Sequence, residues 1–286
     1  MAQQPEIKRI FPAARLAITL FLAAAASAQQ RLPLEPFHDT GQSVTPSFEG
    51  WFQNPDGTFS ILFGYFNRNQ KEEVDISLGA SNRIEPGGPD RGQPTHFQPG
   101  RMWGVFTVTV PKDFGKSKLT WTLVSAGQAT AIPASLDSLW ELAPFKDATE
   151  NTPPVVRLPN GGSVQGPRPG TAELTAAAGS PLTLSVAVSD DAKFVPGTRK
   201  PKTPPATVTW SKYRGPGSVS FAADRPPVQP DDPQPATGFA GKASTTATFS
   251  EPGDYILYLV SNDWTGKGGG GFLCCWTNAL VKVSVR

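Results

Sequence analysis

The chain has few of the residues that enzymes and metal sites use most. Of its 286 residues, two are histidine and two are cysteine, too few for a zinc site built from these side chains alone. It lacks a G-x-S-x-G nucleophile elbow, an H-E-x-x-H sequence and a phosphate-binding glycine loop followed by Lys and Ser or Thr. These absences argue against an enzyme, although two carboxylates from distant strands, as in glycoside hydrolases, would leave no motif.

The two histidines form no recognisable site. His38 lies in a polar N-terminal arm, and His96 lies in a stretch rich in Gly and Pro, residues 85–101. Asp90 and Arg91 precede His96 and could form a loop site with it. Because such stretches run over protein surfaces, we expect His96 instead to be an exposed loop residue.

Long hydrophobic runs are also scarce. Residues 16–26 are apolar, a shorter run than the roughly 20 residues that span a bilayer. Three basic residues precede this run, Lys8, Arg9 and Arg15. A small-residue sequence, Ala-Ser-Ala, ends at Ala28. The pattern predicts a secretory signal peptide at residues 1–28, cleaved before Gln29, and no membrane span in the mature chain.

The expected mature chain has no excess of charge of either sign. Three of the 26 basic residues and one of the 24 acidic residues lie in the leader, so the remainder has a net charge of zero. Arg199, Lys200 and Lys202 make a small basic group that a proline interrupts, as in a solvated loop. We therefore expect no nucleic-acid partner.

The two cysteines, Cys274 and Cys275, are adjacent. An exported protein held together by disulfides would have an even set of cysteines spread along the chain, so stability must come from hydrophobic cores. Neighbouring cysteines close only a strained ring. The interpretation that we favour is two strand residues facing opposite sides, one of them buried; the alternatives are a vicinal disulfide and a metal or redox role.

Glycine and proline, in contrast, are abundant. The chain has 28 Gly and 30 Pro, about a fifth of its residues against roughly 12% in average proteins. Short alternating apolar segments lie between these turn residues, for example on either side of Asn54-Pro55-Asp56-Gly57. The pattern predicts an all-β fold with two immunoglobulin-like β-sandwich domains in tandem.

Shifts in composition suggest the domain boundaries. After the N-terminal arm, residues 29–46, a first β-sandwich domain of unknown family is expected at residues 47–142. A polar linker, residues 143–154, precedes a second sandwich at residues 155–286. The first domain has more aromatic residues than one strand face can bury. They are Phe48, Trp51, Phe52, Phe59, Phe63, Tyr65 and Phe66. Such residues either pack between the domains or stack on sugar rings.

The second domain resembles an immunoglobulin-like module of the PKD (polycystic kidney disease) type. Four segments, spread over about half the chain, carry the resemblance. They are Asn-Thr-Pro-Pro-Val-Val at 151–156, Leu-Thr-Leu-Ser-Val-Ala-Val-Ser-Asp-Asp at 182–191, Val-Thr-Trp-Ser at 208–211 and Phe-Ser-Glu-Pro-Gly-Asp-Tyr-Ile-Leu at 249–257. The resemblance implies a seven-strand sandwich in which Trp210 and Tyr255 are core or corner residues. Such modules are mostly spacers and binders, and the loops here are longer than usual for the family.

The long loops of the second domain carry the candidate binding residues. In an immunoglobulin-like sandwich, alternate loops gather at one pole, here residues 189–205, 222–243 and 262–271. The predicted binding residues of this pole are Asp190, Asp191, Asn262, Asp263 and Trp264. Three of them, Asp190, Asp191 and Asp263, could hold calcium through oxygen ligands. The alternative is a set of solvated acids at strand ends.

Together these features predict an exported, non-catalytic binding, adhesion or assembly protein of the cell envelope. It would be periplasmic, on the cell surface or extracellular, with an envelope protein or polysaccharide as its partner. The alternative is a carbohydrate-active protein, either a sugar-binding module or a glycoside hydrolase without a recognisable motif.

Overall fold

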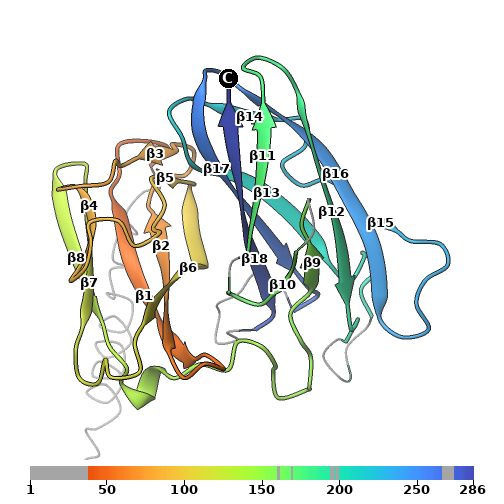
Figure 1. Ribbon diagram of the computed structural model, residues 1–286, viewed down its shortest axis with the longest axis horizontal. Coiled ribbons are helices and arrows are strands. Elements are labelled where there is room, and N and C mark those ends of the chain that lie inside the picture. The colour runs from red at the N-terminus through yellow and green to blue at the C-terminus, as the bar shows by residue number, and fades with distance from the viewer. Residues whose placement is uncertain (1–37, 160–161, 169, 194–196, 198–199, 266–273) are drawn as a thin grey trace, which may run out of the picture. The chain divides into compact units, whose positions relative to one another are not determined.

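The strands of this protein follow from the alternating segments and from the turn residues between them. The computed structural model describes residues 38–159, 162–168, 170–193, 197, 200–265 and 274–286. Within these ranges the fold is all-β, with one short 3-10 helix (η1, Ser138–Trp140). The predicted all-β fold class with two sandwiches is confirmed (Figure 1).

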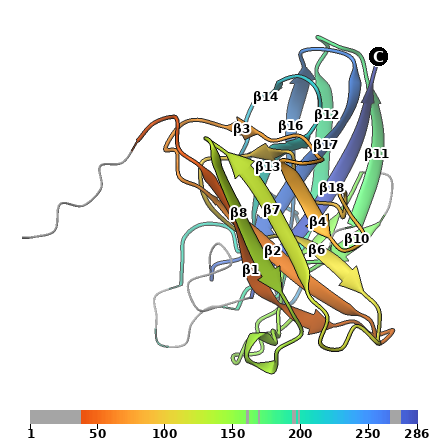
Figure 2. The same ribbon diagram turned by 90° about the vertical axis from the view of Figure 1, so that its left-hand side faces the viewer.

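The first sandwich packs two three-stranded sheets around an aromatic core. One sheet has the order β1-β2-β6 and the other β4-β7-β8, and the short strands β3 and β5 pair beside them. Figure 2 shows β7 and β8 in front of β1 and β2. The strands are β1 (Val44–Gln53), β2 (Phe59–Asn67), β3 (Val74–Asp75), β4 (Asn82–Glu85), β5 (His96–Phe97), β6 (Gly100–Val110), β7 (Leu119–Ser125) and β8 (Gln128–Ala134).

Aromatic rings from both sheets meet inside the first sandwich. The ring of Phe63 on β2 stacks on Phe106 at 5.3 Å between centroids, and Trp121 on β7 meets Phe63 edge-on at 5.8 Å. All three side chains are buried. Most of the aromatic residues that the sequence concentrates in this domain pack in this core, while Phe66 remains exposed.

The second sandwich has the two-sheet arrangement of an immunoglobulin-like module. One sheet has the order β10-β9-β12-β16-β14, with β15 also paired to β16, and the other has the order β11-β18-β17-β13. The strands are β9 (Val155–Arg157), β10 (Ser163–Gln165), β11 (Gly170–Ala176), β12 (Leu182–Asp190), β13 (Thr207–Arg214), β14 (Val219–Phe221), β15 (Gln229–Pro230), β16 (Phe239–Phe249), β17 (Gly253–Asn262) and β18 (Trp276–Val285). The segment that we propose as the linker, residues 143–154, lies between β8 and β9.

Trp210 and Tyr255 lie in the core of the second sandwich. Both side chains are buried among aliphatic residues of the two sheets. The Tyr255 hydroxyl donates to the carbonyl of Glu251 at 2.9 Å and accepts from the amide of Gly217 at 3.1 Å. The polar end of this buried ring therefore ties the start of β17 to the turn before β14.

The outer face of the sheet β11-β18-β17-β13 packs against the first sandwich. Tyr213 and Tyr258 project from this sheet into the hydrophobic cluster of the first sandwich, where both are buried. The Asn278 amide donates to the carbonyl of Gly104 on β6 at 2.5 Å, and the Tyr213 hydroxyl donates to the carbonyl of Gly92 at 2.5 Å. Residues His38–Arg286 accordingly form one compact unit.

Two sequence expectations were wrong. Cys274 and Cys275 do not face opposite sides of a strand: they form a disulfide with each other across a cis peptide bond, and both are buried. His96 is not an exposed loop residue, because it belongs to β5 and is only 6% exposed. Among the described residues, no helix is long and apolar enough to cross a membrane.

Replacing Trp210 by Ala should destabilise the protein by about 3–5 kcal/mol, because removal of the buried indole leaves a cavity between the sheets. The Trp210 Nε1 group is buried without a hydrogen-bond partner, so Trp210→Phe removes no hydrogen bond and should cost much less. Urea unfolding of the full chain measures both changes. A loss below about 1 kcal/mol for Trp210→Ala would contradict the core position of this ring.

Candidate functional site

Three aspartates of the expected binding pole lie at one end of the second sandwich. Asp190 ends β12, where the two-residue alternation that buries Val186 and Val188 also turns Asp190 inward. Asp191 follows it directly. Asp263 follows β17 on the facing sheet and is also buried. We call these three residues, with Asn151, the aspartate pole.

The segment before β9 binds the pole from outside the sheets. The Asn151 side-chain amide donates to Asp263 Oδ2 at 2.6 Å. The backbone amide and the hydroxyl of Thr152 both donate to Asp191 Oδ2 at 3.0 Å. Asn151 and Thr152 are adjacent in the chain, so these bonds hold Asp191 and Asp263 near one another.

Burial dominates the electrostatics of the pole. It raises the pKa of Asp190 to about 7, and the nearby charges of Asp263 and Asp191 act in the same direction. Burial also raises the pKa of Asp263, although Thr265 and Asn151 donate hydrogen bonds that favour its charged form. In the part of the chain that the structure describes, no group of three or more His, Cys, Asp or Glu side chains is placed to hold a metal.

The other two expected pole residues point elsewhere. Asn262 has the opposite orientation to its neighbours on β17 and lines a groove between the two sandwiches. The Trp264 indole donates to the carbonyl of Thr203 at 3.0 Å, and the Lys200 ammonium lies 5.4 Å from the centre of its ring. The bonded pair Cys274 and Cys275 lies beside the pole, with both sulfurs within 3.8 Å of the Asn151 carbonyl.

The groove between the two sandwiches was not expected from the sequence. It has two compartments, of about 550 Å³ and about 300 Å³. Gln98 of the first sandwich and Trp210, Ser211 and Asp224 of the second line both compartments, so the two compartments adjoin in one groove. We call it the interdomain groove.

A chain of charged side chains crosses the larger compartment. Asp75 Oδ1 is 2.9 Å from His96 Nδ1 and 3.5 Å from the Lys212 ammonium of the second sandwich. On the other side of the imidazole, Glu73 Oε2 and Gln98 Nε2 lie 3.1 Å and 3.0 Å from His96 Nε2. The hydrogen bond with His96 is the main cause that lowers the pKa of Glu73. Its carboxylate is therefore ionised at neutral pH.

The smaller compartment is aromatic. Trp103, Met102 and Trp276 are among the residues that line it. The Trp103 indole is 37% exposed. The Arg101 guanidinium lies 3.8 Å from the centre of the Trp103 ring. Arg101 in turn donates to Ser47 Oγ at 2.9 Å and pairs with Glu49. This network holds the indole in position at the edge of the groove.

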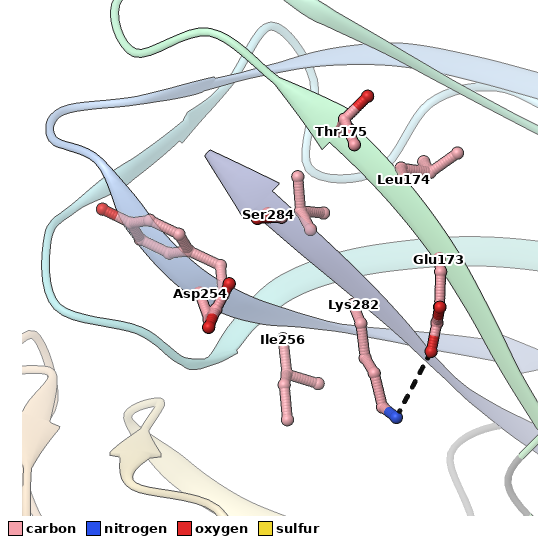
Figure 3. Close-up of a pocket in the computed structure, with 9 residues that line it drawn as sticks. Glu173, Leu174, Thr175, Asp254, Ile256, Lys282 and Ser284 are labelled. Atoms are coloured by element: carbon pink, nitrogen blue, oxygen red, sulfur yellow. Dashed lines mark ion pairs between the residues drawn. The ribbon is translucent and has the colours of Figure 1, made fainter. Parts of the chain in front are cut away.

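A further hollow of about 670 Å³ lies over β11, β17 and β18. Figure 3 shows its side chains standing on the strands, with Lys282 and Glu173 paired at 3.6 Å. Its lining residues all belong to the second sandwich. We therefore place the candidate site in the interdomain groove, where both sandwiches contribute.

A signal for the groove is present in the sequence but is incomplete. Glu73 and Asp75 are two residues apart, as are His96 and Gln98, a spacing that puts side chains on one side of extended backbone; only Asp75 and His96 belong to the short strands β3 and β5. The structure pairs Asp75 directly with His96 across β3 and β5. The spacing within each pair is visible in the sequence, whereas the pairing of the two strands is not.

Comparison with known proteins adds little to this geometry. No protein-family model and no curated protein matches the chain. Among solved structures, the chain is similar to the D00-D0 domain of Intimin, with 11% identity over 84% of this chain and 99% of that one, at a TM-score of 0.26. Domains 4 and 5 of the S-layer protein SbsC match with 13% identity over 85% of this chain and 98% of that one, at 0.21. CfaE, the adhesive subunit of the CFA/I fimbria of enterotoxigenic Escherichia coli, matches with 8% identity over 89% and 81%, at 0.23. Scores of this size carry no argument about function, which has to come from the site.

The buried Asp190 should make stability depend on pH. Its pKa is about 7 in the folded protein against an ordinary value of 3.8, so the folded state holds a proton that the unfolded chain releases. The free energy of unfolding should fall as pH rises from about 4 to 7, by up to about 1.4 kcal/mol per pH unit. Asp190→Asn should flatten this part of the profile.

Urea unfolding between these pH values measures the effect, with Asp232→Asn, at an exposed loop position, as the control. An Asp190→Asn profile as steep as that of the unaltered protein would show that Asp190 titrates normally in the fold.

Proposed function

We propose that the protein is an exported, non-catalytic binding protein of the cell envelope and that it binds an envelope polysaccharide in the interdomain groove. The observation that carries the proposal is a groove whose two adjoining compartments share lining residues of both sandwiches. Compartments of about 550 Å³ and about 300 Å³ lie within the size range of pockets that hold small ligands or single units of a polymer. An adhesion or assembly role would use the same surface.

The chemistry of the groove suits a ligand with many hydroxyl groups. The larger compartment presents carboxylates, an amide and serine hydroxyls, which donate and accept hydrogen bonds. The smaller one presents the Trp103 indole, whose apolar face can stack on a sugar ring. Neither compartment is basic enough to favour nucleic acid, which needs a positively charged surface.

Preorganisation also supports a binding role. Lys212 and Asp75 connect the two walls of the groove, and Arg101 fixes the Trp103 ring. The side chains that line the groove would therefore need little rearrangement on binding, so the entropic cost of ordering them would be small. The kinship of the second sandwich with PKD modules is part of this proposal, supported by the positions of Trp210 and Tyr255 in its core.

A hydrolase acting on the same polysaccharide is the second candidate, since Glu73 and Asp75 flank His96 in the groove. A glycoside hydrolase needs one carboxylic acid that stays protonated near the working pH. The pKa of Glu73 is shifted the other way, because its hydrogen bond with His96 stabilises the carboxylate. This shift of the Glu73 pKa favours binding without turnover.

Trp103→Ala should weaken polysaccharide binding about tenfold or more, equivalent to about 1.4 kcal/mol, because it removes the exposed ring of the groove. The matched control is Trp140→Ala, since Trp140 is 49% exposed but lies on η1, away from the residues that line the groove. Calorimetric titration of the full protein with oligosaccharides from envelope polysaccharides measures the affinity, and product analysis of the same samples measures turnover.

Equal losses in the two variants, or the absence of binding to every envelope polysaccharide, would contradict the proposal. Release of shortened oligosaccharides, abolished by Glu73→Gln, would instead support the hydrolase.

A further inference from the structure

The aspartate pole contains buried oxygen atoms that lack hydrogen-bond partners. In the described part of the chain, Asn151 Oδ1, Asp190 Oδ2 and Ser261 Oγ are buried without a partner. The three residues are 1%, 8% and 0% exposed. Buried polar atoms in native proteins are nearly always satisfied by protein, water or an ion. Asn151 Oδ1 and Asp190 Oδ2, the two that belong to the pole, therefore point to an additional group there.

The positions of the three atoms follow from their neighbours. The Asn151 amide nitrogen donates to Asp263 Oδ2 at 2.6 Å. A carboxylate only accepts, so this bond fixes the amide orientation and turns Asn151 Oδ1 away from Asp263. Ser261 lies two residues before Asp263 and shares its face of β17, inside the sandwich. Asp190 faces inward from the opposite sheet, close enough for the charge of Asp263 to act on it.

The bonds of the aspartates show which carboxylate can accept a further ligand. Asp191 is engaged on both oxygens: Oδ2 accepts from Thr152, and Oδ1 accepts from the Lys193 amide at 3.1 Å. Asp263 is engaged on both oxygens as well, by Asn151 and Thr265. Asp190 accepts only from the Ala192 amide at 2.7 Å, on Oδ1, and its Oδ2 has no partner.

The charge at the pole favours a cation over a neutral group. Asp190 and Asp263 are two buried carboxylates. The Lys193 ammonium lies 3.9 Å from Asp191, which takes no part in the site proposed below, and donates to the Glu150 carbonyl at 2.5 Å. Calcium takes carboxylate, amide and water oxygens together in flexible geometry, and these are the atoms that the pole offers.

We propose that a divalent cation of the calcium type binds at the aspartate pole through Asp190 Oδ2 and Asn151 Oδ1, with Asp263 adding negative charge and Asp191 taking no part as a ligand. This ligand set differs from the three aspartates that the sequence suggests. Because Asn151 belongs to the segment between the sandwiches, the cation connects that segment to β12. Water molecules complete its coordination, which is consistent with weak, millimolar affinity.

The test is the thermal unfolding of the full protein in calcium and in chelator. Millimolar calcium should raise the melting temperature, by mass action on a site present only in the folded state. Asp190→Asn should reduce the calcium affinity derived from the melts at least tenfold, since an amide removes the charge and keeps the shape. Asp191→Asn is the matched control, one residue away, and should leave the calcium affinity within twofold.

A second variant covers the case in which Asp190→Asn fails to fold. Asn151→Asp places a carboxylate against Asp263, so its melting temperature should depend more strongly on calcium than that of the unaltered protein. Coinciding melts in calcium and chelator, for the unaltered protein and for Asn151→Asp, would overturn the proposal and leave a buried water as the missing group. Equal losses of affinity in Asp190→Asn and Asp191→Asn would overturn the ligand set.

Discussion

The packing of the first sandwich on the outer face of the sheet β11-β18-β17-β13 is the constraint on which the rest of the structure depends. It covers part of the outer face of that sheet, so the middle of β17 is packed on both sides. On β17, Tyr255 and Leu257 point into the second sandwich, while Ile256 and Tyr258 pack against the first. A strand covered on both sides has to be apolar at every position, and residues 255–260, Tyr-Ile-Leu-Tyr-Leu-Val, have this composition.

Both candidate sites follow from this packing. The interdomain groove exists because β13, at the edge of that sheet, lies beside β5, where Lys212 meets Asp75. Thr209 on β13 and Trp103 on β6 line its smaller compartment. The aspartate pole exists because the segment that connects the sandwiches returns to the end of β12 and β17, where Asn151 and Thr152 bind two aspartates. In each case the site lies where one sandwich meets the other or meets the segment between them.

The sequence predicts the fold better than the sites, for a physical reason. Alternation along one strand is local, so the all-β class and the turn at Asn54–Gly57 can be derived from neighbouring residues, whereas the inward positions of Trp210 and Tyr255 are what the resemblance to PKD modules implies. Strand pairing is not local. His96 was expected in an exposed loop because nothing near it in the sequence indicates that β5 pairs with β3. For Cys274 and Cys275, adjacency leaves several chemistries open, and the structure has the disulfide.

Cooperative unfolding tests the central claim, that the two sandwiches form one body, most directly. Gly104 on β6 has a φ of +51°, and a Cβ atom there would overlap the Trp276 ring of the second sandwich. The matched control is Gly127, in the turn between β7 and β8, which has a φ of +72° and open space around it. We expect one calorimetric transition for the unaltered protein, and Gly104→Ala should increase amide hydrogen exchange in β12 and β16 as well as in β2 and β7. Gly127→Ala should act only around its own turn. Two independent transitions, or a Gly104→Ala effect confined to the first sandwich, would contradict the account.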